Sequence, residues 1–150
     1  MQHKEFVGLM ESNFLMLDWL DRRLKSAPGD LGHSRTQIRL LARLHLHGRT
    51  LLKDIARSSE IPTSNLCILL KNLESDGLVL RQVDAEDRRN TWYSLTRAGE
   101  KVACEALESL RCRIAALFEP LGQKDEARLT SALRTMNEIL HKIKTTHNKE

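Results

Sequence analysis

Residues 50–96 constrain the fold more than any other part of the chain, because they combine two closely spaced short helices with a polar hairpin. Apolar residues recur at helical spacing over residues 51–59 and again over residues 62–76, which predicts a helix in each range. Glu60, Ile61 and Pro62 form the turn between the two helices. Two short helices joined this tightly are typical of a helix-turn-helix unit.

The helix predicted for residues 62–76 has two contrasting faces. One face carries apolar side chains at helical spacing, namely Leu66, Leu69, Leu70 and Leu73. Pro62 suits the first turn of this helix, and Gly77 suits the position just after its last turn. The opposite face is small, polar and nearly free of acidic residues. The candidate DNA contacts on this helix are Ser64, Asn65, Ile68 and Lys71.

Two interpretations of that polar face are open. A face without acidic side chains can enter a DNA major groove without repelling phosphate, and a thymine methyl group is a partner for the outward Ile68. The alternative is a solvated surface helix with one exposed apolar residue, a common feature of soluble proteins.

The hairpin adds a second candidate for DNA contact. Residues 78–83 and 91–95 are rich in strand-forming side chains, and the polar residues 84–90 connect them. Arg88 and Arg89 lie at the tip, where two arginines can enter a narrow minor groove or bind phosphates. Asp87 is positioned to orient one guanidinium through a bidentate pair. The alternative is a solvated charged loop.

This order of elements resembles the MarR family of winged helix-turn-helix transcription regulators. That family shows Asp-x-Arg at the wing tip and then Leu-Thr-x-x-Gly at the start of the next helix, a pattern matched here by Asp87, Arg89, Leu95, Thr96 and Gly99. Residues 73–79 also resemble the end of the family's recognition helix, and the resemblance extends over nearly the whole chain.

The resemblance implies a mainly α fold with a small β-hairpin wing, namely a winged helix-turn-helix with N- and C-terminal dimerisation helices. On this reading residues 1–150 form a single MarR-like domain. Residues 1–33 and 119–150 supply the dimerisation helices, residues 34–101 the winged helix-turn-helix, and residues 102–118 a connecting helix.

The sequence departs from the family pattern within the recognition helix. Two positions that are often basic in the family hold Ile68 and Asn72, which leaves Lys71 as the cation of this helix. We therefore expect DNA binding to depend more strongly on the wing and on phosphate contacts.

The helix expected after residue 33 offers a further phosphate contact. Ser34, with Gln37 three residues later, matches a capping box. Arg35 and Thr36 follow in the first turn, where backbone N–H groups favour an anion. The alternative is an ordinary capped helix end.

The flanking helices predict a homodimer. Residues 2–25, 102–117 and 129–143 carry more apolar surface at helical spacing than a small winged domain can cover. A two-fold dimer would bury this surface and would read palindromic double-stranded DNA. The resemblance further implies a small effector molecule, often aromatic or anionic, bound between the dimer base and the winged lobe.

Charge and motifs narrow the class of function. Residues 35–101 hold 12 basic and 8 acidic residues, so the net charge of +4 lies on the segment expected to meet DNA. No phosphate-binding loop, nucleophile motif or metal-ligand spacing is present, so we expect no enzyme activity, no cofactor and no metal site.

No membrane or signal segment is evident in the sequence, so we expect a cytoplasmic protein with reduced cysteines. Of these, Cys104 and Cys112 are expected in or near the core.

A second class of function stays open: a winged-helix scaffold for protein interaction or dimerisation, with weak DNA reading. The exposed Ile68 is the feature that supports it, because an outward apolar side chain can equally contact a protein.

Overall fold

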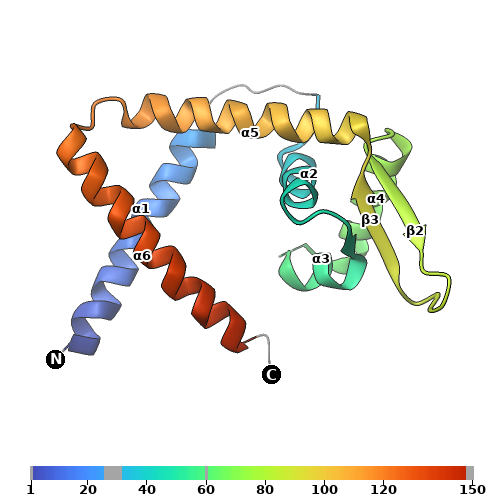
Figure 1. The fold of residues 1–150 in the computed structure, drawn as a ribbon, viewed down its shortest axis with the longest axis horizontal. Helices are drawn as coiled ribbons and strands as arrows, with labels where there is room; N and C mark the ends of the chain where they lie inside the picture. The colour runs from blue at the N-terminus through green and yellow to red at the C-terminus, as the bar shows by residue number, and fades with distance from the viewer. Residues whose placement is uncertain (1, 26–31, 60, 148–150) are drawn as a thin grey trace. The chain divides into compact units, whose positions relative to one another are not determined.

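The computed structural model describes residues 2–25, 32–59 and 61–147 and divides into two compact units, Met1–Arg113 and Ile114–Glu150. The elements follow one another in the order α1 (Gln2–Lys25), α2 (Arg35–His47), β1 (Thr50–Leu51), α3 (Leu52–Ser58), α4 (Thr63–Ser75), β2 (Val79–Val83), β3 (Thr91–Leu95), α5 (Arg97–Phe118) and α6 (Gln123–His147) (Figure 1). The fold is mainly α with a small antiparallel sheet, as predicted.

The sheet contains a strand that the sequence did not predict. Its order is β1-β3-β2, with both pairs antiparallel, so β3 is the central strand. Leu51 lies in β1 and pairs with Trp92 of β3. Leu51 had been expected to begin the first helix of the helix-turn-helix. The prediction failed because two residues are too short to show strand alternation. Gly48, with a φ of 69°, ends α2 and turns the chain toward β3.

The core of the first unit is built mainly from aliphatic side chains. Its fully buried residues include the α4 side chains Leu66, Leu70 and Leu73, and Leu69 packs partly buried at the edge of the same cluster. The predicted apolar face of α4 is therefore confirmed. Burial of each large aliphatic side chain contributes about 1.5–3 kcal/mol, so this face fixes the rotation of α4 about its own axis.

The C-terminus of α4 ends in a Schellman motif. Gly77 has a φ of 71°, its N–H donates to the carbonyl of Glu74 over 3.0 Å, and the Leu78 N–H donates to the carbonyl of Leu73 over 2.9 Å. Leu73 and Leu78 are both buried, as the hydrophobic contact of this motif requires. The glycine predicted to end this helix is confirmed.

The start of α5 is bound to the end of α4, in a contact that we call the α4–α5 clamp (Gly77, Leu78, Thr96 and Gly99). The Thr96 N–H donates to the carbonyl of Leu78 over 3.0 Å, and its hydroxyl donates to the carbonyl of Gly77 over 2.6 Å. The Gly99 N–H donates to the Thr96 hydroxyl over 3.0 Å, so Thr96 caps α5 as predicted. A Cβ atom at Gly99 would lie 1.9 Å from the Leu78 carbonyl oxygen, so only glycine fits here.

One prediction about α5 is wrong. Cys104 and Cys112 were expected in or near the core, but both thiols are free and exposed. Both cysteines face away from the buried residues of α5, which are Gly99, Ala103 and Ala106. Within the first unit, the Arg113 guanidinium donates to the carbonyl of Leu24 over 3.0 Å and so joins α5 to the end of α1.

The second unit contains the end of α5 and all of α6, and residues 119–122 connect the two helices. The apolar side chains Leu129, Leu133, Ile139, Leu140 and Ile143 of α6 are exposed in the single chain. In the first unit α1 is also rich in exposed apolar side chains, among them Phe6, Leu9, Phe14, Leu15 and Leu17. None of the described helices is long and apolar enough to cross a membrane.

The α4–α5 clamp predicts an unusual cost for a small substitution. Because the added methyl group meets backbone rather than a movable side chain, we expect Gly99→Ala to lower the free energy of unfolding by about 1–3 kcal/mol. Thermal unfolding followed by circular dichroism at one protein concentration measures the change. Gly8→Ala is the matched control, because Gly8 is also helical and a Cβ atom there meets nothing within 4 Å. Equal melting temperatures for the two variants would contradict the clamp.

Candidate nucleic-acid interface

The exposed face of α4 carries the predicted contacts together. Ser64, Asn65, Ile68 and Lys71 are all exposed, and the Ile68 side chain is 61% accessible. The first turn of α4 contains no acidic residue. Because the leucines on the other side of the helix are buried, the face that α4 turns to solvent is nearly free of acidic side chains.

The N-terminus of α4 differs slightly from the prediction. Pro62 was expected in the first helical turn but is the N-cap residue, with an extended backbone whose carbonyl accepts from the Leu66 N–H over 2.9 Å. Proline has no side-chain acceptor, and no side-chain hydrogen bond caps this helix. The first backbone N–H groups of α4 therefore keep their capacity to bind an anion.

The wing tip (residues 84–90) is shaped by two aspartates. Asp84 accepts the N–H groups of Glu86 and Asp87, over 3.0 and 3.4 Å, and the Asp84 N–H donates to the Asn90 carbonyl over 2.9 Å. Asp87 accepts the Arg89 N–H over 3.0 Å and the Asn90 side-chain amide over 3.3 Å. These bonds close the tip into a defined turn.

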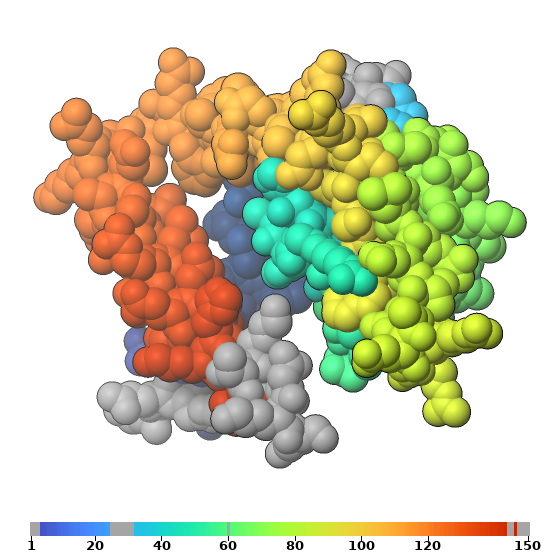
Figure 2. Space-filling model, turned by 45° about the vertical axis from the view of Figure 1, so that its right-hand side comes forward, coloured from blue at the N-terminus to red at the C-terminus, as the bar shows by residue number. Residues whose placement is uncertain are grey.

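The role predicted for Asp87 is therefore wrong in its detail. Asp87 was expected to pair with an arginine guanidinium, but its carboxylate instead binds backbone and amide groups of the tip, and no ion pair joins it to Arg88 or Arg89 within the described wing. A carboxylate two residues before an N–H forms a local turn more readily than it reaches a long, mobile arginine. Both arginines are exposed, and the wing projects from the molecule (Figure 2, yellow-green).

Three residues connect the wing to the rest of the first unit, and we call them the wing anchor (Arg49, Asp84 and Trp92). The Trp92 indole Nε1–H donates to the Asp84 carboxylate over 3.1 Å. The Arg49 guanidinium lies 4.5 Å from the centre of the Trp92 ring, within the range of a cation–π interaction. Separately, Lys53 of α3 donates to the Asn90 side chain over 3.4 Å.

The sequence analysis missed these residues. The signal available was the single tryptophan in β3, whose indole N–H needs a partner, but the pairing of Trp92 with Arg49 depends on β1 and therefore on the unpredicted strand.

Arg35 and Thr36 lie apart from the wing. They occupy the first turn of α2, and Ser34 caps that helix through the predicted capping box with Gln37. The other end of α2 leads into β1, which pairs with β3. At 1.5 Å per residue, the first turn is about 18 Å from that end. A DNA phosphate bound at Arg35 would therefore belong to a different part of the DNA backbone from the part that the wing contacts.

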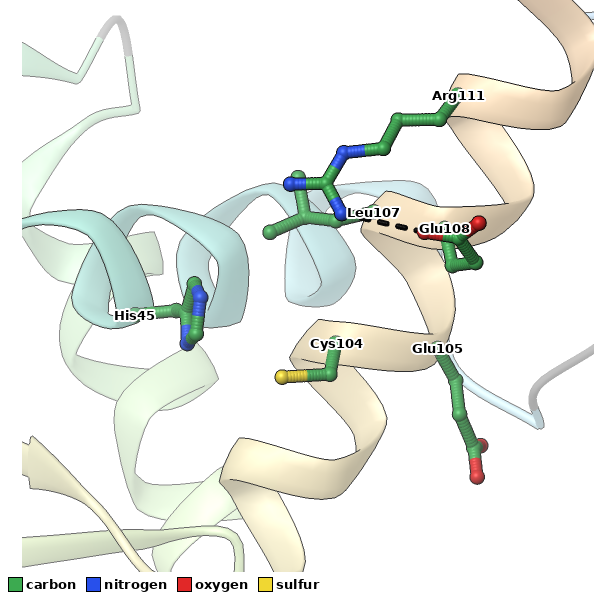
Figure 3. A pocket seen from close by; sticks show the side chains of 6 residues that line it. All are labelled: His45, Cys104, Glu105, Leu107, Glu108 and Arg111. Atoms are coloured by element: carbon green, nitrogen blue, oxygen red, sulfur yellow. Dashed lines mark hydrogen bonds and ion pairs between the residues drawn. The ribbon is translucent and has the colours of Figure 1, made fainter.

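A pocket of about 360 Å³ lies between α2 and α5, lined by His45, Cys104, Glu105, Leu107, Glu108 and Arg111 (Figure 3). Two of its side chains have carboxylate partners: the Arg111 guanidinium binds Glu108 over 3.1 Å, and the His45 Nδ1 lies 2.8 Å from the Glu100 carboxylate. In the part of the chain that the structure describes, no group of three metal-ligating side chains comes together.

The wing anchor predicts how Asp84 titrates. Hydrogen bonds from Trp92 and from two backbone N–H groups, with a smaller effect of the Arg49 charge, lower the pKa of Asp84 below its ordinary value of 3.8. A lowered pKa in the folded state means that the anchor is complete above pH 3.8 and is lost only as the pH falls through the folded pKa. We expect the Trp92 indole N–H resonance to titrate with a midpoint below 3.8. Asp84→Asn should remove this titration, and a midpoint at or above 3.8 in the original chain would contradict the geometry.

Comparisons with known proteins agree with this geometry. The family model described as the MarR family matches residues 33–91. The chain is 33% identical over 102 residues to the HTH-type transcriptional regulator FarR of Neisseria gonorrhoeae, covering 68% of each protein. It is 28% identical over 87 residues to the uncharacterized HTH-type transcriptional regulator YwhA of Bacillus subtilis, covering 58% of this chain and 63% of that protein, less than two thirds of its length.

Solved structures show the same fold. Wild-type MarR from E. coli, in its apo form, superposes with a TM-score of 0.75 at 18% identity, covering 85% of this chain and 95% of that one. NadR in complex with 4-hydroxyphenylacetate superposes with a TM-score of 0.57 at 27% identity, covering 87% and 89%. The matched relatives, the family model and the winged helix-turn-helix agree, and the chain belongs to the MarR family of transcriptional regulators.

Proposed function

We propose that this protein is a homodimeric, sequence-specific DNA-binding regulator that acts as a repressor and responds to a small molecule. The observation that carries the proposal is the combination, in one compact unit, of an exposed α4 surface whose first turn holds no acidic residue with two exposed arginines at the tip of an adjoining wing. Its role is binding rather than catalysis, and its place is the cytoplasm, where its DNA lies.

In this proposal α4 enters the major groove. Ser64, Asn65 and Lys71 supply polar and charged groups for base edges and phosphates, and Ile68 supplies an apolar surface for a thymine methyl group. The uncapped first turn of α4 can bind a phosphate through its backbone N–H groups. Lys71 is the one cation in α4, so this helix alone provides little charge for binding.

The wing provides more cationic side chains than α4 does. Arg88 and Arg89 are both exposed, and the Asp87 carboxylate is occupied by the Arg89 N–H and the Asn90 amide. The guanidinium groups are therefore available for a minor groove, where arginine is favoured by the negative potential. Arg35 and Thr36, in the first turn of α2, are proposed to bind a further phosphate.

A homodimer fits the apolar side chains that remain exposed on α1 and on α6. Contiguous exposed apolar surface of this kind is uncommon on monomeric proteins and marks interaction surfaces. A two-fold axis would offer two copies of α4 to half-sites of a palindromic operator about 34–36 Å apart.

The small-molecule response is supported by the relative NadR, whose structure was solved with 4-hydroxyphenylacetate bound. An effector regulates by binding one spacing of the two DNA-reading helices more tightly than another and so shifting the population. We propose the same class of response here, with an effector whose identity is to be found by screening against DNA binding.

The second candidate, a protein-interaction scaffold with weak DNA reading, is favoured by the 61% exposure of Ile68. The two functions differ in their response to salt. Binding that depends on phosphate contacts weakens steeply as ionic strength rises, whereas an apolar contact between proteins does not.

Alanine substitutions test the proposed division between wing and helix. We expect Arg89→Ala to weaken operator binding by about 1–3 kcal/mol and Lys71→Ala to weaken it less. Each substitution should also reduce, by about one, the slope of the logarithm of the binding constant against the logarithm of the salt concentration. Fluorescence anisotropy at several salt concentrations gives both quantities. Arg134→Ala is the control, because it removes the same charge from the exposed surface of α6. The division is wrong if affinity survives Arg89→Ala and disappears with Lys71→Ala.

The mass in solution tests the dimer. We expect light scattering at micromolar concentration to give twice the 17.2 kDa mass of the chain, because burial of the exposed α1 and α6 side chains stabilises association. Leu133→Glu places a charge among the apolar side chains of α6 and should shift the mass toward the single chain. A folded monomer at this concentration in the original protein would rule out an obligate dimer.

A further inference from the structure

The wing is a weakly supported part of the first unit. Its strand β2 lies at the edge of the sheet, and four of the five β2 residues are exposed. The tip at residues 84–90 is stabilised mainly by its own hydrogen bonds, which set its shape but not its direction. Arginines at such a tip reach a groove in register with α4 only if the direction of the wing is also fixed.

Trp92 is the side chain best placed to fix that direction. It lies in the central strand, paired with Leu51 of β1 on one side and with Gln82 of β2 on the other. Its indole N–H binds Asp84, the first residue of the tip, and its ring contacts Arg49, which follows the turn at Gly48. One side chain thus connects the tip to the end of α2.

The chemistry of this connection requires a tryptophan. The indole is a donor without an acceptor, so it fits the carboxylate of Asp84, and its face attracts the guanidinium of Arg49. Phenylalanine would keep the ring for Arg49 but would lose the bond to Asp84. The lost bond would also leave a carboxylate without a side-chain partner beside the DNA phosphates.

We propose that Trp92 is a positioning residue for DNA binding, which orients the wing arginines through Asp84 and Arg49 without contacting DNA itself. The inference rests on the proposed function, because it assigns Trp92 a role in the same interface. The contact between Lys53 and Asn90 is a second, weaker connection at 3.4 Å, so loss of the Trp92 bond should loosen the wing without unfolding the unit.

The test compares Trp92→Phe with the original protein on DNA from the upstream region of its own gene. We expect binding to weaken roughly threefold to tenfold, the range expected for one net hydrogen bond. Hydroxyl-radical footprinting should show loss of protection at the flanking minor-groove positions. Dimethyl sulfate footprinting should show that guanine N7 protection in the major groove is kept. A merely structural defect would instead weaken both kinds of contact together. Trp19→Phe is the control for loss of an indole N–H, because it removes the other one, which lies on α1. Light scattering of this variant should give the same mass as the original protein, which shows that the α1 surface is intact.

A double-substitution cycle makes the assignment stricter. If Trp92 acts through the two wing arginines, Trp92→Phe should cause no further loss of affinity when Arg88→Ala and Arg89→Ala are both already present. Independent, additive losses would overturn the proposal. It would also be overturned if Arg89→Ala weakened binding while Trp92→Phe kept the affinity and the footprint of the original protein.

Asp84→Ala should reproduce the footprint of Trp92→Phe, and unchanged wing protection in Asp84→Ala would likewise overturn the proposal. Absence of selective binding by the original protein would instead refute the proposed function.

Discussion

The α4–α5 clamp is the contact on which the arrangement of the first unit depends. At Gly77 and Leu78 the chain leaves α4, enters β2 and receives the start of α5 through Thr96 and Gly99. The 1.9 Å that would separate a Cβ atom of Gly99 from the Leu78 carbonyl shows how closely the two backbones approach. Because three elements meet at one point, the direction of α4 is joined to that of the hairpin and to that of α5. A change in the path of α5 would therefore move the surface proposed to read DNA.

In the first unit, buried side chains fix the orientation of α4, and the exposed polar and charged side chains are left for contact with a partner. The leucines of α4 fix its rotation by burial, so the side chains on its other face need no contacts of their own and stay free for a partner. The wing tip has no buried side chain, and hydrogen bonds that Asp84 and Asp87 accept hold its shape instead. Those two carboxylates are bound to N–H groups of the tip and of Trp92 and form no ion pair with Arg88 or Arg89 within the described wing, so the arginines stay exposed.

The helices, the hairpin and the capping residues could be predicted from the sequence because each follows from local spacing: leucines at helical intervals, Ser34 with Gln37, Gly77 after the last turn, and Thr96 before α5. Contacts between distant segments could not. The strand β1 has two residues and exists because β3 lies beside it, and the cation–π contact between Arg49 and Trp92 depends on that pairing. The exposure of Cys104 and the partners of Asp87 also depend on geometry that residue type alone does not determine. The candidate site was therefore predicted in its exposed residues but not in the residues that support them.

The most direct test of the account is an anisotropy titration of the unaltered protein with DNA from the upstream region of its own gene and with a scrambled duplex, each at two salt concentrations. Two exposed arginines at the wing tip and an α4 whose first turn holds no acidic residue predict tighter binding to the upstream DNA and a steep loss of affinity at the higher salt. Equal, weak binding to both duplexes would contradict the account and would direct attention to a protein partner for the Ile68 surface.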